Sequence, residues 1–219
     1  MGEMTEFRSD TYDEKLERIL QAAASVFAEK GYHRASIRDL SRATGVSLSG
    51  LYYYVASKED LLFQIQEHCF GTVLENLEQR LRGTNEPVRR LQVFIENHLR
   101  YFAANRCEMK VISHEAASLG AEYRERVNAL KRRYTEICTG ILRALAPPGG
   151  APDLRVATYS LFGMMNWIYN WYDPQGDVGV DQLADTMSRL FLHGFLADGA
   201  LALPVAQAEA YTPPSIWRR

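Results

Sequence analysis

Apolar residues recur at three- and four-residue steps along most of the chain, the spacing of amphipathic helices. No stretch alternates apolar and polar residues as a half-buried strand does. The pattern predicts an all-α protein with about nine helices and frayed residues 1–11. The helices are expected over residues 13–30, 36–44, 47–54, 58–82, 87–104, 107–117, 121–146, 153–172 and 181–198.

Residues that favour helix ends are concentrated between Ser36 and Leu61. Ser36 and Ser57 can each cap a helix, and each is followed three residues later by an aspartate at the capping-box position. Ser47 can cap the short helix between them, and Gly45 supplies the preceding turn. The segment is therefore expected to form two short helices joined by a tight turn, followed by the start of a third.

Charge is distributed unevenly on this chain, whose formal net charge is −2. Between Lys30 and Lys58 five basic side chains stand against a single acidic one, Asp39. A positive patch on a mildly acidic protein is typical of a site-selective DNA-binding protein, although a solvated helix face gives the same pattern. In the first short helix, Ile37, Leu40 and Ala43 are expected to face inward and Arg38 and Arg42 outward.

Two helices joined by such a turn can place the second one in the major groove of DNA, with its first residues at the base edges. The leading outward positions of that helix are Ser47, Leu48, Ser49 and Gly50. Three consecutive tyrosines, residues 52–54, span most of a helix circumference, so at least one is exposed and can bind a phosphate. Lys58 is expected to anchor another phosphate. The alternative is a three-helix bundle with no role in DNA binding.

Residues 19–62 resemble the DNA-binding domain of the TetR family of bacterial transcriptional regulators. The motifs that carry the resemblance are Gly31-Tyr32, Ala43-Thr44-Gly45-Val46-Ser47, Leu51-Tyr52-Tyr53-Tyr54 and Ser57-Lys58-Glu59-Asp60-Leu61. The resemblance implies phosphate contacts from Ser36, Ser47, Tyr52, Tyr53 and Lys58, and base contacts from Leu48, Ser49 and Gly50. Leu48 and Ser49 stand where the family often has Lys or Glu followed by Gly, and Val55 replaces the usual Phe, which leaves the operator sequence open.

Residues 153–172 are apolar nearly all round, so this helix must be buried on most sides. The resemblance implies a homodimer in which the last two long helices pack against their twins as a four-helix bundle. The expected organisation is a DNA-binding domain over residues 12–58, an effector-binding and dimerisation domain over residues 59–200, and a tail over residues 201–219.

Asparagines and tryptophans suggest a ligand site in the 153–172 helix, because Asn166 and Asn170 lie one turn apart and Trp167 and Trp171 lie on an adjacent face. Flat aromatics, methionine and amides suit an elongated, largely apolar ligand with a polar linkage. The candidate ligand-binding residues are Phe102, Met165, Asn166, Trp167, Tyr169, Asn170 and Trp171. The alternative is that the tryptophans pack in the core or a dimer interface and the amides bond to each other.

This helix resembles that of TetR-type regulators of fatty-acid, aromatic-acid and steroid catabolism, whose effectors are acyl-CoA thioesters. A CoA ligand needs cations for its phosphates, and the candidates on the long helix are Arg124, Arg126, Lys131, Arg132 and Arg133; a solvated face explains them equally well. We therefore expect a repressor that binds a near-palindromic double-stranded DNA operator as a homodimer and is released by an acyl-CoA. A sensor of hydrophobic drugs that controls efflux is the second possibility.

An enzyme or a helical lipid carrier is the competing class. The five histidines are scattered, and no hydrolase, metalloprotease, P-loop or dinucleotide motif is present. The cysteines Cys69, Cys107 and Cys138 are not at metal-ligand spacing, so neither a metal nor a cofactor is expected. The N-terminus lacks an apolar signal region, and the apolar run over residues 161–172 is too short to span a bilayer. The expectation is a cytoplasmic non-enzyme that makes no membrane contact.

Overall fold

The computed structural model describes residues 3–146, 153–176 and 178–196, and the expected tail over residues 201–219 lies outside them. These described residues form helices and no strand, which confirms the all-α prediction. The elements are α1 (Glu3–Lys30), α2 (Ile37–Thr44), α3 (Leu48–Tyr54), α4 (Lys58–Leu81), α5 (Pro87–Ala104), α6 (Arg106–His114), the 3-10 turn η1 (Ala116–Ser118), α7 (Ala121–Leu145), α8 (Leu154–Asn166), α9 (Ile168–Trp171) and α10 (Val180–Phe195).

Most helix boundaries lie within about three residues of the prediction; the helix expected over residues 107–117, for example, ends at His114 and is followed by η1. Two differ more. Helix α1 begins at Glu3, whereas residues 1–11 were expected to fray; no glycine or proline interrupts residues 3–30, so nothing in the sequence stops the helix from extending. The predicted helix over residues 153–172 is divided at Trp167. The Asn170 N–H bonds to the Trp167 carbonyl at 3.1 Å, which is a tighter turn than the α-helical one and ends the common face of α8 and α9.

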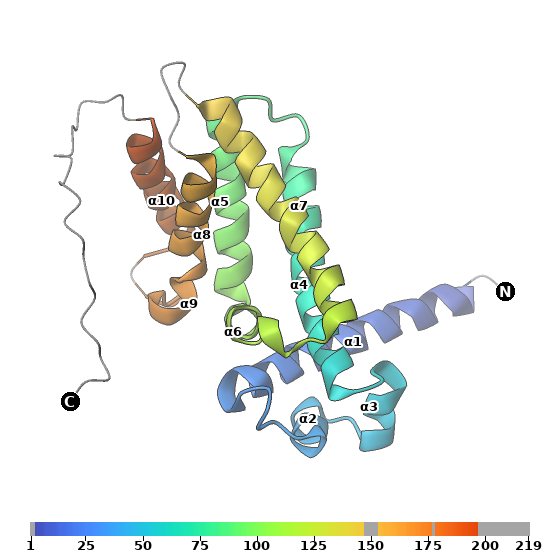
Figure 1. Ribbon diagram of the computed structural model, residues 1–219. Coiled ribbons are helices and arrows are strands. Elements are labelled where there is room, and N and C mark those ends of the chain that lie inside the picture. The colour runs from blue at the N-terminus through green and yellow to red at the C-terminus, as the bar shows by residue number, and fades with distance from the viewer. Residues whose placement is uncertain (1–2, 147–152, 177, 197–219) are drawn as a thin grey trace, which may run out of the picture.

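Helices α2 and α3 form one end of the molecule, beside α1 and the start of α4 (Figure 1). The remaining helices form the body, in which α4 packs on α7, α5 packs on α10, and α8 contacts α7 and α10. The short helix α6 lies across the junction, because it contacts α1 on one side and α4, α5 and α9 on the other. Helix α6 is therefore placed between the α2–α3 end and the body.

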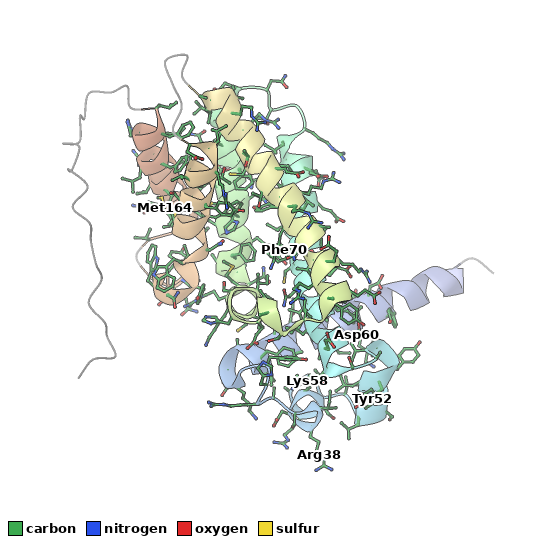
Figure 2. All side chains as sticks on the ribbon, in the orientation of Figure 1. Arg38, Tyr52, Lys58, Asp60, Phe70 and Met164 are labelled. Atoms are coloured by element: carbon green, nitrogen blue, oxygen red, sulfur yellow. The ribbon has the colours of Figure 1, made fainter. Side chains whose placement is uncertain are left out.

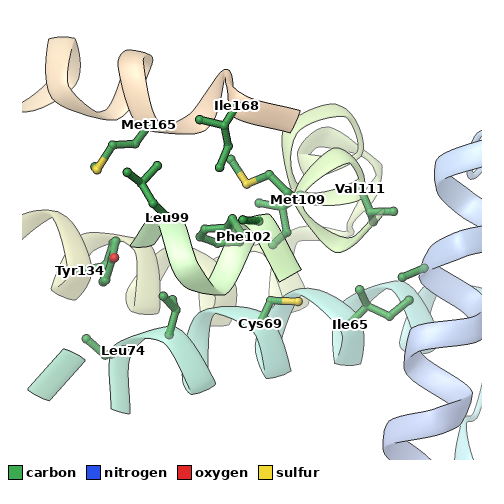
Figure 3. Close-up of a cluster of buried hydrophobic side chains, with 14 of the residues drawn as sticks. Ile65, Cys69, Leu74, Leu99, Phe102, Met109, Val111, Tyr134, Met165 and Ile168 are labelled. Atoms are coloured by element: carbon green, nitrogen blue, oxygen red, sulfur yellow. The ribbon is translucent and has the colours of Figure 1, made fainter. Parts of the chain in front are cut away.

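The core of the body is assembled from apolar side chains of five consecutive helices (Figure 3). Cys69 of α4, Phe102 of α5, Met109 of α6, Tyr134 of α7 and Met165 of α8 are all buried. Truncation of a large buried aromatic side chain costs about 3–5 kcal/mol of folding free energy, so this cluster fixes the relative positions of the helices. Among the described residues, no helix is long and apolar enough to span a membrane.

Candidate nucleic-acid interface and body cavity

Capping contacts fix the start of α2. The Asp39 N–H donates to Ser36 Oγ at 3.2 Å, and the Asp39 carboxylate accepts from the Ser36 N–H at 3.0 Å, which completes the predicted capping box. Lys30 Nζ donates to the same carboxylate at 2.8 Å. Hydrogen bonds from Lys30 and then Ser36 hold the pKa of Asp39 well below its usual value. Gly45 ends α2 at φ 67°, a left-handed conformation that suits glycine.

An exposed face at the free end of α2 and α3 contains most of the residues predicted to bind DNA. Figure 2 shows Arg38 and Tyr52 at this end, away from the body. Tyr53 is 71% exposed. Ser36 and Ala43 are also exposed, although Ala43 was expected to face inward. We call the DNA face the exposed set of Ser36, Arg38, Ser47, Leu48, Ser49, Tyr52 and Tyr53.

Gly50 has a packing role that differs from its predicted outward position. Its backbone N–H donates to Ser47 Oγ at 3.1 Å, and a Cβ at this position would lie 2.7 Å from Val46 Cγ1. Glycine is therefore required for the close approach of α3 to its own turn. Gly50 is only partly exposed, so its role is to let α3 pack against Val46 and Ser47 and not to contribute a side chain to the DNA face.

Lys58, predicted to anchor a phosphate, points toward the protein. Its Nζ donates to the carbonyls of Tyr32 at 2.9 Å and Ala35 at 3.0 Å, and it lies 4.5 Å from the centroid of the Tyr32 ring. An ammonium group has three N–H donors, so two of them are used within the protein. Lys58 thus joins the α1–α2 loop to the start of α4.

Tyr12, which the sequence analysis did not single out, supports the DNA face. Its ring stacks on Tyr54 at 4.9 Å between centroids and meets the edge of Tyr53 at 6.0 Å. The contact depends on the N-terminal part of α1, because Tyr12 lies just before Asp13, the predicted start of a helix that begins at Glu3. The sequence signal that could have indicated this contact was an aromatic residue directly before the expected start of the helix.

A cavity of about 330 Å³ lies in the body between α4, α5, α6, α7 and α8. Its apolar walls come from Phe70, Phe102, Met109, Ile112, Tyr159 and Phe162. Its polar lining comes from His98, Ser113, Lys131, Tyr134, Thr135 and Asn166. Of the seven residues predicted to bind a ligand, the structure places Phe102 and Asn166 at this cavity.

The other five predicted ligand residues do not line this cavity, and for those from Trp167 onward the division of the helix accounts for the difference. Met165 is fully buried in the core. Trp167 and Trp171 are 61% and 54% exposed, on the outside of the molecule. The Tyr169 hydroxyl is 3.0 Å from His114 Nε2, and Asn170 is exposed. The side chains that the helical spacing had grouped therefore face different surroundings.

His98 is the buried polar residue of the cavity that the sequence analysis missed. Its Nδ1 lies 3.3 Å from the Tyr134 hydroxyl, while its Nε2 has no hydrogen-bond partner among the described residues. Burial lowers the pKa of His98 to about 3, and the nearby Asn166 side chain acts weakly in the opposite direction, so the ring is neutral at pH 7. The available signal was its position one turn from Phe94 and Phe102 on the apolar face of α5.

Lys131 is the only one of the five predicted phosphate-binding cations that lines the cavity. Its Nζ lies 5.1 Å from the Phe70 ring centroid, and burial lowers its pKa. Three of the arginines form ion pairs on the surface at 2.7 Å, which join Arg126 to Glu67, Arg132 to Glu125 and Arg133 to Glu78. Lys131 therefore supplies the positive charge of the cavity wall.

Large apolar side chains are exposed along α8 and α10. Leu190 of α10 is 65% exposed, and Val156 and Tyr159 of α8 are also exposed. Together with Trp167, Trp171 and Leu196 they form what we call the apolar face of the body. Since α8 and α10 are in contact, their exposed apolar side chains are a candidate interaction site.

Hydrogen bonds connect the segment after α6 to the loop between α1 and α2. Glu115 accepts from the Tyr32 N–H at 3.1 Å through Oε1, and Ser118 Oγ lies 3.3 Å from His33 Nε2. Within the body, Glu59 at the start of α4 accepts from the Gly120 N–H at 2.6 Å. Since α6 also contributes Met109 and Ile112 to the cavity, the same helix contacts the cavity and carries the contact to Tyr32.

The chain is similar to known bacterial regulators. The Bacillus subtilis "Fatty acid metabolism regulator protein" is 26% identical, with 71% of this chain and 84% of that protein aligned. A crystal structure of a TetR-family transcriptional regulator from Bordetella parapertussis is 33% identical, covers 83% of this chain and 95% of that one, and superposes with a TM-score of 0.76. The structure of AibR in complex with isovaleryl coenzyme A and operator DNA is 28% identical, covers 80% and 97%, and has a TM-score of 0.72.

Family models cover both parts of the chain. Residues 19–65 match the model described as bacterial regulatory proteins, tetR family, and residues 84–195 match the tetracyclin repressor-like C-terminal domain. The second match alone covers half of the chain, and the first contains the capped α2–α3 pair. The chain therefore belongs to the TetR family of bacterial regulatory proteins and is a DNA-binding transcriptional repressor of the helix-turn-helix type.

Proposed function

We propose that this protein binds a near-palindromic DNA operator as a homodimer and that an acyl-CoA in the body cavity releases it. The observation that carries the proposal is the cavity itself, which is largely apolar, has a cation in its wall and shares α6 with the contact to Tyr32. The relatives named for fatty-acid metabolism and for isovaleryl coenzyme A support the choice of effector.

The DNA face supplies two kinds of contact. Arg38, Tyr52 and Tyr53 extend from the free end of α2 and α3 and suit phosphates. Leu48 and Ser49 begin α3, where a recognition helix meets base edges; the Leu48 side chain suits a thymine methyl. Residues 12–58 thus act as the DNA-binding domain, in the cytoplasm where bacterial DNA is found.

The apolar face of the body suits a second copy of the chain. Val156, Tyr159 and Leu190 lie on the two helices that pair with their twins in this family, and burial of their side chains favours association. Two-fold symmetry would set two DNA faces about one turn of DNA apart, which matches a near-palindromic site.

Release follows from the position of α6. An acyl group that fits the volume of the cavity but not its shape presses on Met109 and Ile112 and shifts α6. Movement of α6 changes the Glu115–Tyr32 contact and hence the orientation of the DNA face. The effector shifts the equilibrium only by as much as it binds the displaced state more tightly.

A salt-sensitive gel shift on the protein's own promoter, reversed by an acyl-CoA, is the direct test. The expected result is a retarded band that weakens with added salt and disappears as octanoyl-CoA is added. Free coenzyme A at the same concentration is the control, because it carries the phosphates without the acyl group and shows whether the phosphates alone release the DNA. Failure to bind any promoter-proximal fragment contradicts the proposed operator, and a band that no acyl-CoA affects contradicts the proposed effector.

A sensor of hydrophobic drugs remains the second candidate, because five aromatic rings line the cavity, those of Phe70, Phe102, Tyr134, Tyr159 and Phe162. The partly buried ammonium of Lys131 disfavours a cationic drug and favours an anionic ligand. A thermal-shift screen separates the two, since the proposed effector raises the melting temperature by mass action. A response to hydrophobic cations with none to acyl-CoAs would favour the drug sensor.

A helical lipid carrier, the alternative from another class, would not need the exposed DNA face on α2 and α3.

A further inference from the structure

We propose that His98 recognises the carbonyl oxygen of the effector's acyl group through its Nε2–H, in a cavity sized for a short or medium acyl chain. The inference rests on the proposed function, because it takes the body cavity as the effector site. It adds the residue that distinguishes an acyl thioester from an equally apolar ligand and sets an upper limit on the acyl group.

The contact between His98 and Tyr134 bears on which ring nitrogen carries the hydrogen. Nδ1 lies 3.3 Å from the Tyr134 hydroxyl, which can donate its proton to that nitrogen. A neutral imidazole that accepts at Nδ1 carries its hydrogen on Nε2, and this is the tautomer that the proposal takes for His98. Tyr134 is thus a positioning residue for a donor at the cavity.

The donor at Nε2 has no acceptor in the described part of the chain, although His98 is only 2% exposed. Buried polar groups are nearly always hydrogen-bonded, so an unpaired donor at a cavity indicates a partner that arrives with the ligand. The Asn166 amide also lines the cavity and lies near enough to the ring to oppose the effect of burial on its pKa, but it does not meet the distance and angle of a hydrogen bond to Nε2. A ligand oxygen beside His98 would restore the missing hydrogen bond.

The surroundings of His98 favour a neutral carbonyl over a carboxylate. The Phe102 ring lies 4.6 Å from the His98 ring and the Phe162 ring 6.2 Å, between centroids. The imidazole is neutral, so it offers no positive charge to a buried carboxylate, whose desolvation would then be uncompensated. A thioester oxygen accepts a hydrogen bond without that cost. Lys131, elsewhere in the cavity wall, is available to the anionic remainder of a CoA ligand.

The volume limits the acyl group. An apolar cavity of about 150 Å³ holds one benzene molecule. The cavity of about 330 Å³ therefore suits roughly a dozen non-hydrogen atoms by the same scale. An octanoyl or phenylacetyl group fits this estimate, whereas a stearoyl chain exceeds it. The inferred ligand class is a short- or medium-chain acyl or arylacyl thioester.

Two ligands that differ only at the carbonyl test the assignment. Octanoyl-CoA and its thioether analogue S-octyl-CoA are titrated into the full-length protein by calorimetry. The wild-type protein is expected to bind the thioester about tenfold more tightly, the effect of one buried hydrogen bond. His98→Leu should bind the two ligands equally, while His98→Gln, which keeps an N–H donor, should recover part of the preference. His114→Leu, outside the cavity, is the matched control and should keep it.

Tyr134→Phe tests the hydrogen bond between Tyr134 and His98 without removing the imidazole. Without the hydroxyl, the ring hydrogen of His98 can lie on either nitrogen. The preference for the thioester is therefore expected to fall by severalfold while the thioether binds as before. A structural role for Tyr134 alone would weaken both ligands equally. The wild-type comparison of the two ligands needs no variant and stands even where His98→Leu fails to fold.

The outcomes separate this inference from the proposed function. Equal binding of thioester and thioether to the wild-type protein, or a preference that survives in His98→Leu, overturns the carbonyl assignment and leaves the acyl-CoA proposal intact. Tighter binding of free octanoate overturns the thioester class. Tighter binding of stearoyl-CoA than octanoyl-CoA overturns the size limit. No binding of any CoA compound overturns the proposed effector and this inference together.

Discussion

Glu115 of the body and Tyr32 of the α1–α2 loop are joined by a hydrogen bond of 3.1 Å between the carboxylate Oε1 and the backbone N–H. The carbonyl of Glu115 also accepts from Gln66 of α4 at 3.3 Å, and its Oε2 accepts from Ser118 at 2.8 Å. One residue at the end of α6 therefore contacts the DNA-binding part, α4 and its own turn. Glu115 is therefore placed to couple effector binding in the body to DNA binding at α2 and α3.

Glu115→Ala is expected to uncouple the two sites. The variant loses the acceptor for the Tyr32 N–H, so movement of α6 no longer reaches the DNA face through this contact. More effector should be needed to release the operator, while effector affinity in the absence of DNA changes by less than about twofold, since Glu115 does not line the cavity. Glu115→Gln keeps an oxygen acceptor and should behave like the wild type. Fluorescence anisotropy of labelled operator at increasing octanoyl-CoA measures both variants.

Arg38→Ala is expected to weaken operator binding through the loss of one phosphate contact. The slope of log affinity against log salt should become shallower by about one unit, because one fewer counterion is released. Arg143→Ala, an exposed position at the opposite end of α7, is the control and should leave the slope unchanged. An unchanged slope in Arg38→Ala would remove Arg38 from the DNA face.

Tyr53→Ala is expected to weaken DNA binding while the dimer stays intact. Tyr53 is the most exposed of the three consecutive tyrosines, and its hydroxyl is free to reach a phosphate. The expected loss in gel-shift affinity is roughly five- to tenfold, the contribution of about one hydrogen bond to a charged group. Size-exclusion chromatography with light scattering checks the dimer. Wild-type affinity in this variant would contradict the phosphate contact.

Leu190→Glu is expected to dissociate the proposed dimer, because a charge would be buried in the apolar face of α8 and α10. Leu190 is largely exposed in the single chain, so the fold itself should survive, as far-UV circular dichroism can verify. Light scattering should show the mass fall by half, and operator affinity should fall with it. Ala144→Glu, exposed on α7, is the control. A dimer that persists in Leu190→Glu would move the interface elsewhere.

Acid is expected to destabilise the protein through His98. Burial lowers the pKa of this residue to about 3, whereas an unfolded histidine titrates near 6.5. The unfolded state therefore binds a proton that the folded state excludes, and the free energy of unfolding falls as pH drops from about 6.5 toward 3, by up to about 1.4 kcal/mol per pH unit. Urea unfolding at pH 7, 6 and 5 should show a shallower dependence in His98→Gln. The same substitution at exposed His114 should leave the wild-type slope.

The DNA-binding part could be predicted from sequence because its determinants are local. The Ser36–Asp39 box and Gly45 act within a few residues of themselves, so their structure follows from their spacing. Lys58 shows the limit of that reasoning, because its ammonium donates to the Tyr32 carbonyl, which lies 26 positions earlier in the chain. A helical wheel shows which side chains share a face but not whether that face meets solvent, the core or a neighbouring loop.

The cavity could not be predicted because it depends on long-range packing and on a break within a helix. Periodicity treats residues 153–172 as one cylinder, and the turn at Trp167 turns Trp167 and Trp171 outward. His98 was overlooked because a lone histidine carries no motif. Its chemistry arises from Tyr134, 36 positions further along the chain, which lies against it only after α5 and α7 have packed.

Helix α4 spans 24 residues, so it is about 36 Å long at 1.5 Å per residue. Phe70, near its middle, lines the cavity, and Lys58, at its first turn, is fixed to the carbonyls of Tyr32 and Ala35. A tilt of roughly 5° about one end of a rod of that length displaces the other end by about 3 Å, nearly the rise of one base pair of DNA. Because Lys58 is bonded to the loop before α2, the helix-turn-helix moves together with the start of α4. Phe70 lies about halfway along this length, so a displacement at the cavity is roughly doubled at the start of the helix. An adjustment of about 1.5 Å at the cavity therefore suffices, without any unfolding, for a mismatch with the groove.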